Sequence, residues 1–348
     1  MLMIILGAGA SYDSYATRPP VKGNRENKDS NRPPLAKELF EDRPMFDELL
    51  NRFNQCQEIL HKLRGLPPNK SLEEVLEKLR EEAKTFSKGR QQLMAVKYYI
   101  QLAIERCESG WGGIHRGATN HKSLINRVER WRSQQNEPVA IVTFNYDTLI
   151  EKALTSFWGH TFQALDDYVR YPDYMLFKLH GSVDWGHVTR CGLTDREFRD
   201  PLAVEQRIIS LIDSSGTTIY DDFFEMKSAA SRLMDKGQVL SPAIAIPVKN
   251  KDSFECPKSH LETLEKVIPK VDKLLVVGWR AQEEHFLRYL KLLSKEVRVL
   301  VVAGDTADVK QTGDALRAAG AKGTYTDIKQ GFSYLVQNDE VIDRLLWD

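Results

Sequence analysis

Five short, largely apolar runs limit what this chain can fold into. They cover residues 2–6, 139–142, 175–179, 274–277 and 297–302. A short apolar run of this kind is typical of a strand that is covered on both faces, as in a parallel sheet. Helical stretches follow several of the runs, at 148–157, 283–293 and 312–319. Strand followed by helix, repeated along the chain, predicts a doubly wound α/β sheet with its ligand site at the carboxyl ends of the strands.

Two further stretches extend the predicted sheet, and two insertions interrupt it. Residues 322–328 predict an edge strand, and residues 239–246 predict another strand before Pro247. More than 120 residues separate the first apolar run from the second, far more than one crossover needs. The chain is therefore predicted to contain a discontinuous Rossmann-like domain, a large helical insertion and a second, smaller and mostly helical insertion. The expected bounds are 1–15 with 137–348 for the domain, 35–135 for the first insertion and 186–236 for the second.

The first insertion shows the pattern of two amphipathic helices. Ser71 and Glu74 form a capping box, in which the serine oxygen and the glutamate carboxylate each satisfy an exposed amide at a helix start. Apolar residues then recur at helical spacing, which predicts one buried face on each helix. These residues are Leu72, Val75, Leu76, Leu79 and Ala83 in the first helix and Leu93, Val96, Ile100, Ala103, Ile104 and Cys107 in the second. Residues 16–34 are rich in Pro, Asn, Lys and Arg without any period, which predicts a loop near the site.

Charge, hydropathy and cysteine usage exclude several classes of protein. The 348 residues carry 49 Lys and Arg against 49 Asp and Glu, so no net charge attracts the chain to nucleic acid or to an anionic membrane. Hydrophobic residues at 42% and charged residues at 28% are ordinary for a globular protein and exclude long disorder. No run approaches the roughly 20 apolar residues of a membrane span. The four cysteines stand singly, without a Cys-x-x-Cys pair for zinc, so we expect no metal and a cytoplasmic location.

A glycine loop follows the first apolar run directly. In Gly7-Ala8-Gly9-Ala10-Ser11, small residues would let backbone amides approach a pyrophosphate closely. The alternative is a tight turn between strand and helix, which needs the same residues. A P-loop is excluded because no Gly-Lys-Ser/Thr follows, and a dehydrogenase fingerprint is disfavoured because a third glycine and the acidic residue of the second strand are missing.

Polar residues follow the second and third runs at the same predicted edge of the sheet. Thr143, Asn145 and Asp147 come after the second run, and His180 follows the third. Asn145 and His180 would converge there on the glycine loop. The alternative for Asp147 is to cap the helix that begins at Thr148, because capping needs the same residue type. A lone histidine at a strand end is more often structural than catalytic.

Three of these segments together resemble the sirtuin superfamily. Gly7-Ala8-Gly9-x-Ser11 resembles its Gly-Ala-Gly-x-Ser element, Thr143-x-Asn145-x-Asp147 resembles its Thr-x-Asn-x-Asp element, and His180-Gly181 resembles its catalytic His-Gly. Their order along the chain is the order found in the superfamily. The resemblance covers residues 1–13, 139–185 and 272–305.

The resemblance implies NAD as the substrate and gives each residue an expected role. Asp147 would contact the nicotinamide carboxamide, Asn145 the ribose and the attacking water, and His180 would act as a general base. The pyrophosphate would be held by the glycine loop, and Thr143 and Gly278 would complete the cofactor site. Asp305, after the run at 297–302, would accept hydrogen bonds from the adenosine ribose, although a loop carboxylate is more often solvated. The residues expected to bind NAD are Gly7, Ala8, Gly9, Ser11, Thr143, Gly278 and Asp305.

Two departures from the superfamily sequence elements narrow the activity that is expected. The paired cysteines of the deacylase zinc ribbon are absent, with only Cys191 and Cys256 in that region. The later Gly-Thr/Ser-Ser element reads Gly278-Trp279-Arg280. The chain thus looks like the zinc-free, sirtuin-like NAD hydrolases of bacterial anti-phage defence, which implies a homo-oligomeric effector of abortive infection with a partner such as a HerA-type ATPase or an Argonaute-like protein. The alternatives are a sensor that binds NAD or ADP-ribose without catalysis, and an NAD-dependent protein deacylase.

Overall fold

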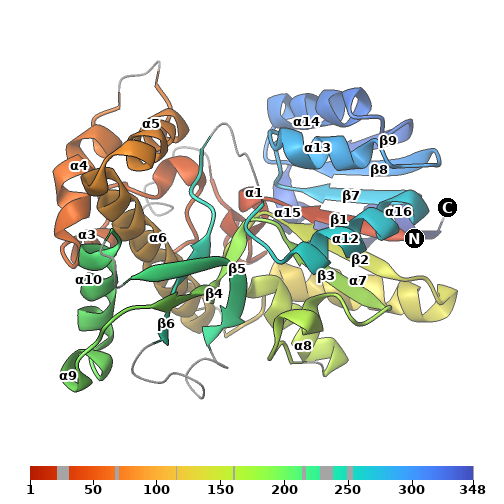
Figure 1. Ribbon diagram of the computed structural model, residues 1–348. Coiled ribbons are helices and arrows are strands. Elements are labelled where there is room, and N and C mark those ends of the chain that lie inside the picture. The colour runs from red at the N-terminus through yellow and green to blue at the C-terminus, as the bar shows by residue number, and fades with distance from the viewer. Residues whose placement is uncertain are drawn as a thin grey trace.

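The centre of the structure is a parallel sheet of six strands. The computed structural model describes residues 1–21, 31–66, 70–114, 116–159, 161–213, 217–227, 238–248 and 254–347. The strand order in the sheet is β3-β2-β1-β7-β8-β9 (Figure 1). The strands are β1 (Leu2–Leu6), β2 (Val139–Thr143), β3 (Tyr174–Lys178), β7 (Lys273–Val277), β8 (Val297–Val302) and β9 (Gly323–Ile328). The five strands predicted from the apolar runs are confirmed, and so is the edge strand predicted at 322–328.

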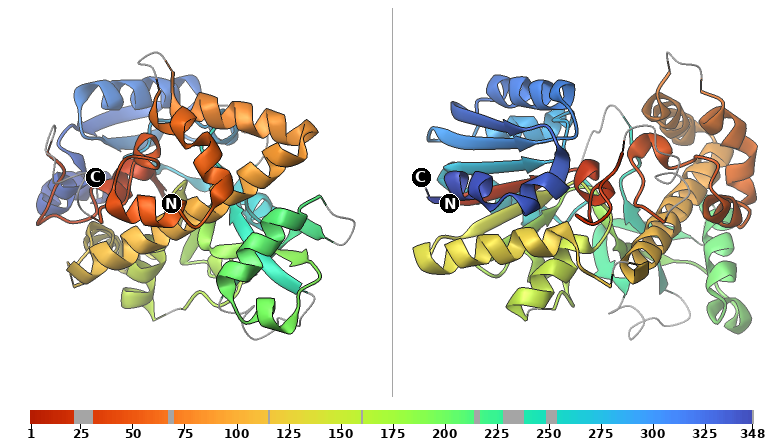
Figure 2. Two further views of the ribbon diagram at one scale, coloured as in Figure 1. Left: turned by 90° about the vertical axis from the view of Figure 1, so that its left-hand side faces the viewer. Right: turned by 180° about the vertical axis from the view of Figure 1, so that it is seen from behind.

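Helices cover both faces of this sheet, as its apolar strands require. Helices α12 and α13 lie on the near face in Figure 1, and α7, α15 and α16 lie on the far face seen in Figure 2. All five residues of β1 are buried. The helices of this domain are α1 (Ala8–Tyr12), α7 (Asn120–Gln135), α8 (Leu149–Trp158), α12 (Lys258–Val267), α13 (Glu284–Leu290), α14 (Thr306–Ala318), α15 (Gly331–Gln337) and α16 (Asp339–Trp347), with short 3-10 turns η2 (Leu165–Tyr168) and η3 (Ile268–Lys270).

The sheet has its topological switch point at β1. From β1 the chain runs to β2 and β3 on one side, and β7, β8 and β9 extend the sheet on the other. Loops from the two sides therefore separate at the carboxyl end of β1, and a crevice at this place is the usual ligand site of such sheets.

A second module packs beside the carboxyl ends of the strands (Figure 1). It contains helices and an antiparallel sheet of order β5-β4-β6. Its elements are η1 (Ala36–Glu38), α3 (Pro44–Leu50), α4 (Asn54–Arg64), α5 (Leu72–Thr85), α6 (Ser87–Ile114), β4 (Gly181–Arg190), α9 (Asp195–Phe198), α10 (Pro201–Leu211), β5 (Thr218–Met226) and β6 (Gln238–Ile244). We use "second module" for these elements throughout.

The helical character predicted for 35–135 is confirmed, but not its packing as one unit. The Ser71 hydroxyl accepts the Glu74 amide at 3.3 Å and starts α5, as the capping pattern predicts. The last helix of this stretch, α7, instead packs with the parallel sheet, and Leu124, Val128 and Trp131 belong to the core of the Rossmann-like domain. Its apolar face fits the sheet, so the helical insertion ends before α7.

For the described residues 186–213 and 217–227, the prediction of a mostly helical insertion at 186–236 is wrong. The stretch contains the end of β4 and the whole of β5 as well as α9 and α10. β5 is a strand because Thr218, Ile219 and Tyr220 favour extended backbone and pair with β4. The strand predicted at 239–246 is present as β6 but joins this second sheet.

The two insertions share one hydrophobic core. Tyr99 and Ile100 of α6 pack in one cluster with Ile208 of α10 and with Val239 and Ile244 of β6. Segments that lie more than 90 residues apart in the sequence thus bury a common surface. The second module is therefore a single packing unit made from two separate stretches of chain.

The loop predicted at 16–34 lies only partly within the described residues. Residues 22–30 are outside them. Arg32 donates to the carbonyl oxygens of Tyr12 at 2.7 Å and Arg18 at 2.8 Å, and its guanidinium lies over the rings of Tyr12 and Trp111. Arg32 thereby ties one end of the loop to the chain that leaves the glycine loop.

Candidate functional site

The glycine loop packs backbone against backbone with the loop after β7. The Gly7 amide donates to Val277 O and the Gly9 amide to Gly278 O, each at 3.0 Å. A Cβ on Gly7 would lie 2.5 Å from Gly278 O, and one on Gly9 would lie 2.8 Å from Gly278 Cα. The close approach of the two loops therefore requires glycine, as the tight-turn interpretation predicts. The amides of Gly7 and Gly9 are used inside the protein, and Ala8 is the exposed residue of the loop.

Asn145, Asp147 and Ser11 form one hydrogen-bonded group at the switch point. The Asn145 side-chain amide donates to Gly7 O and to the Ser11 hydroxyl oxygen, each at 2.9 Å. The Ser11 hydroxyl in turn donates to Asp147 Oδ2 at 2.5 Å. Thr143 Oγ1 accepts the Asn145 backbone amide at 3.1 Å. The structure thus brings together four of the residues that were expected at the site, and all four are buried.

Asp147 also supports the start of α8. Its Oδ1 accepts the Leu149 amide at 3.1 Å, while Thr148 is the N-cap residue and makes no side-chain cap bond. One carboxylate oxygen therefore faces the helix start and the other faces the glycine loop. The capping interpretation and the site interpretation of Asp147 are compatible.

His180 follows β3 and lies against the aromatic neighbours of Asn145. Its ring centroid is 4.9 Å from that of Phe144 and 6.5 Å from that of Tyr146. Trp279, from the loop after β7, stacks on Phe144, with the ring centroids 5.2 Å apart and the planes 10° apart. The imidazole is only 4% exposed. His180 and Trp279 therefore belong to one aromatic cluster at the edge that carries Asn145.

Gly278 and Asp305 lie at the carboxyl ends of β7 and β8. Gly278 has a φ of +62°, and a Cβ there would lie 2.3 Å from the Ala10 nitrogen, so only glycine fits. Asp305 is exposed and caps α14 by accepting the Asp308 amide at 2.8 Å. Arg280 pairs with Asp308 at 3.0 Å. Gly278 thus touches the glycine loop, whereas Asp305 contacts neither the loop nor Asn145 through any hydrogen bond among the described residues.

Part of the chain matches a known family. Residues 139–298 match the SIR2-like domain. The match runs from the start of β2 into β8 and contains the Asn145–Asp147 turn, His180 and Gly278. It supports a sirtuin-like domain and a function related to NAD. Comparison of the chain with curated proteins finds no match.

A charged cluster beside His180 was not predicted from the sequence. The Glu255 amide donates to Leu179 O at 3.0 Å, and the Glu255 carboxylate contacts His187 Nε2 and lies 3.6 Å from Lys97 Nζ. Burial opposes ionisation of Glu255, but Lys97 and His187 together outweigh it and lower the pKa of Glu255 to about 2. The three side chains come from α6, β4 and the stretch before α12. No local sequence pattern connects these three residues. The one signal of a role is structural, namely that His187 is a buried histidine on β4.

Tyr146 links the same region to the second module. Its hydroxyl donates to Ala245 O at 2.6 Å, and the Ala245 amide donates to His180 O at 3.0 Å. Burial raises the pKa of Tyr146, and the nearby charges of Glu283 and Glu255 raise it further. The neutral phenol therefore fixes the position of His180 relative to the chain that follows β6.

Metal-ligand clusters and membrane-spanning helices are both absent from the described residues. Those residues contain no group of three His, Cys, Asp or Glu side chains that could hold a metal ion. All four cysteines are buried and free. Within the same ranges no helix has both the length and the apolar character needed to cross a bilayer.

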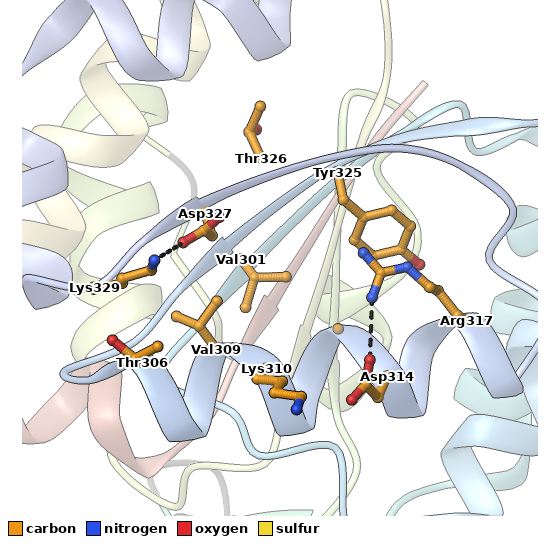
Figure 3. A pocket seen from close by; sticks show the side chains of 11 residues that line it. Val301, Thr306, Val309, Lys310, Asp314, Arg317, Tyr325, Thr326, Asp327 and Lys329 are labelled. Atoms are coloured by element: carbon orange, nitrogen blue, oxygen red, sulfur yellow. Dashed lines mark hydrogen bonds and ion pairs between the residues drawn. The ribbon is translucent and has the colours of Figure 1, made fainter.

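Two surface hollows lie away from Asn145. One, of about 250 Å³, lies between α14 and strands β8 and β9 (Figure 3). Four of its charged side chains form two pairs, Arg317 with Asp314 and Lys329 with Asp327, each at 3.3 Å. The other, of about 480 Å³, lies among α4, α5 and α6 of the second module and includes His61 and Phe86. Neither contains a residue predicted for the site.

Proposed function

We propose that the chain hydrolyses NAD at the bond between nicotinamide and ribose. The observation that carries the proposal is the hydrogen-bonded group of Asn145, Ser11 and Asp147 at the switch point, with His180 in the adjoining aromatic cluster. The match to the SIR2-like domain supports NAD as the substrate. The products would be nicotinamide, ADP-ribose and one proton.

The proposed reaction needs orientation and charge stabilisation more than an acid. The bond from the ribose anomeric carbon to the nicotinamide nitrogen breaks, and both electrons leave with nicotinamide, which becomes neutral. Positive charge then develops on the sugar, as in other glycosidic cleavages. Water attacks the anomeric carbon, and His180 accepts its proton. General-base assistance of this kind contributes roughly 10²- to 10⁴-fold.

Asn145 and Asp147 would orient the two reacting parts of NAD. In the proposal Asp147 contacts the nicotinamide carboxamide, and Asn145 holds the ribose and the attacking water. Ser11 was expected to hold the pyrophosphate. In the structure its proton is donated to Asp147 and its oxygen accepts a hydrogen bond from Asn145, so it joins these two side chains. In the glycine loop the exposed residue is Ala8, at the start of α1.

The test is nicotinamide release from NAD by the purified chain. Asn145→Ala and His180→Ala should each lower kcat at least about 100-fold, while the circular dichroism spectrum and Tm stay close to those of the wild type. Ser182→Ala is a matched control, because Ser182 lies two residues after His180 and its hydroxyl donates to a backbone oxygen, Tyr146 O, at 3.4 Å. Equal rates of NAD loss in wild type and both variants would refute the assignment.

The biological role proposed is that of an effector in bacterial anti-phage defence. It rests on the resemblance to zinc-free, sirtuin-like NAD hydrolases, and it includes a cytoplasmic location, a homo-oligomeric state and a regulatory partner such as a HerA-type ATPase or an Argonaute-like protein. Cells that express the wild-type chain with its partner should lose NAD on phage infection, and cells with the Asn145→Ala chain should keep it. NAD levels that stay constant in both strains would contradict this role.

A second candidate function is an NAD or ADP-ribose sensor. Asn145, Ser11 and Asp147 hydrogen-bond to one another and are only 4 to 8% exposed. This favours a sensor, because polar side chains that are already held in place suit tight binding. Calorimetry with NAD followed by product analysis separates the two, since binding without nicotinamide release favours the sensor. A deacylase would release O-acetyl-ADP-ribose from an acetyl-lysine peptide and NAD.

A further inference from the structure

Lys178 is a fully buried lysine at the end of β3. Its side chain is 0% exposed, and it lies in register beside Thr143 of β2. The ammonium group donates one hydrogen bond to the Asp147 carbonyl oxygen and another to Glu151 Oε1, the latter at 2.7 Å. A buried ammonium is unfavourable unless it is paired. One of the partners of Lys178, the Asp147 carbonyl, belongs to the turn that carries the proposed site residues.

Glu151, in the first turn of α8, is buried with Lys178. Its Oε1 also accepts the Tyr168 hydroxyl at 3.2 Å, and its Oε2 has no hydrogen-bond partner among the described residues. Burial raises the pKa of Glu151 to about 7, with Lys178 opposing the rise and Asp184 adding to it. The groups that face Glu151 are thus Lys178 from β3, Tyr168 from η2 and Asp184 from β4.

The buried pair of Lys178 and Glu151 is better explained by the position it gives to a neighbouring peptide group than by a gain in stability. A buried ion pair gives little net stability relative to apolar side chains of the same size, because both ions lose their hydration. What the pair does determine is the position of one peptide group. With its carbonyl held by Lys178 and its carboxylate held by Ser11 and the Leu149 amide, Asp147 is fixed at three points.

We propose that Lys178, paired with Glu151, is a positioning residue that fixes the turn from Asn145 to Asp147 against the glycine loop. It acts through the Asp147 peptide. The kinetic consequence rests on the proposed NAD cleavage, whereas the structural consequence does not. A positional error of about 1 Å at reacting groups can lower a rate about 100-fold.

The first experiment compares variants of the pair. Lys178→Met/Glu151→Gln removes both charges together and avoids leaving one of them buried alone. It should lower kcat for nicotinamide release about 10- to 100-fold with little change in KM, and Lys178→Arg with intact Glu151 should recover part of the loss. Arg127→Met/Asp343→Asn is the matched control, since this pair joins α7 to α16 and touches none of these residues. The control should leave kcat unchanged.

Glu151→Gln alone supplies a pH test. Glutamine resembles the protonated carboxyl, so wild type and variant should differ in kcat above pH 7 and converge as the pH falls below it. A variant that loses only stability would show the same ratio to wild type at every pH. Such a constant ratio, or unchanged kcat in the double variant, would overturn the proposal.

Hydrogen–deuterium exchange of the peptide that spans residues 143–149 gives a readout that needs no activity. The double variant should exchange faster there than wild type, and the Arg127→Met/Asp343→Asn control should not. If wild type fails to cleave NAD but exchange rises in the double variant, the proposed function fails and the positioning role stands. If wild type cleaves NAD but exchange at 143–149 is unchanged in the double variant, Lys178 is not a positioning residue.

Discussion

Gly278 shows how strongly a single residue can constrain the site. Its φ of +62° is unfavourable for other residues, and its backbone lies against Gly9 and Ala10. The same contact explains why Gly7 and Gly9 are glycines. The loops after β1 and β7 therefore depend on each other's lack of side chains, and the switch point forms only when all three positions are small.

We predict that Gly278→Ala destabilises the fold by more than about 2 kcal/mol. The added Cβ would meet the Ala10 nitrogen at 2.3 Å, so either the glycine loop or the loop after β7 must move. Urea unfolding measures the change in the free energy of unfolding. Gly304→Ala is the control, because no atom lies within 4 Å of its added Cβ and it should change stability by less than about 0.5 kcal/mol. Equal stability of both variants would show that the two loops are not in contact.

For single residues, the sequence predicted the polar residues of the site but not the buried charged residues that contact them. Asn145 and Asp147 could be recognised because their types and spacing follow a strand directly, and His180 because it ends the next strand. Lys178 and Glu255 could not be recognised in the same way. Glu151 lies 27 residues from Lys178, and His187 lies 68 residues from Glu255. No local period in the sequence shows which distant side chain a buried charge will contact.

Among the elements, short apolar runs were the most reliable signal. β1 and β8 have the bounds that their runs predict, because a strand that is covered on both faces consists mainly of apolar residues. β4 and β5 were missed because they lie in a sheet that is only partly covered. Polar residues such as Asp184 and His187 break any apolar run in β4, and Asp221 and Asp222 of β5 are exposed.

His260 connects α12 to η2 and makes stability depend on pH. It is fully buried, with Nε2 bonded to Leu165 O at 3.0 Å. Burial lowers the pKa of His260 to about 4, against about 6.5 in an unfolded chain. Between these values the unfolded state binds more protons, so stability is complete above pH 6.5 and is lost as the pH falls toward 4. The loss from this one residue approaches roughly 3 kcal/mol.

We predict that His260→Gln flattens this dependence. The glutamine amide can still donate to Leu165 O but does not titrate. Free energies of unfolding measured in urea from pH 7.5 to pH 4.5 should fall less steeply in the variant than in wild type. His121, whose pKa is also lowered to about 4 by burial, keeps its own contribution in the variant. A slope identical to that of wild type would show that His260 is not buried as a neutral ring.

At the scale of the whole molecule, two hydrophobic cores meet at the proposed site. The first lies on the parallel sheet, and the second joins both insertions in the second module. Their boundary passes near His180, since its backbone accepts Ala245 from the chain after β6 while its ring packs on Phe144 of the sheet domain. The position of the histidine therefore depends on both cores.

We predict that damage to one core spreads across both insertions but not into the sheet. Ile208, on α10, is fully buried in the second core, so Ile208→Ala should lower the free energy of unfolding by about 2 to 5 kcal/mol. Because α10 shares that core with α6, hydrogen exchange should rise in Ser87–Ile114 as well as near residue 208, and stay unchanged in β1. Leu154→Ala, in the first core, should give the opposite pattern. Faster exchange confined to 186–227 in Ile208→Ala would mean that the two insertions are separate units, and that the second module does not act as one body on His180.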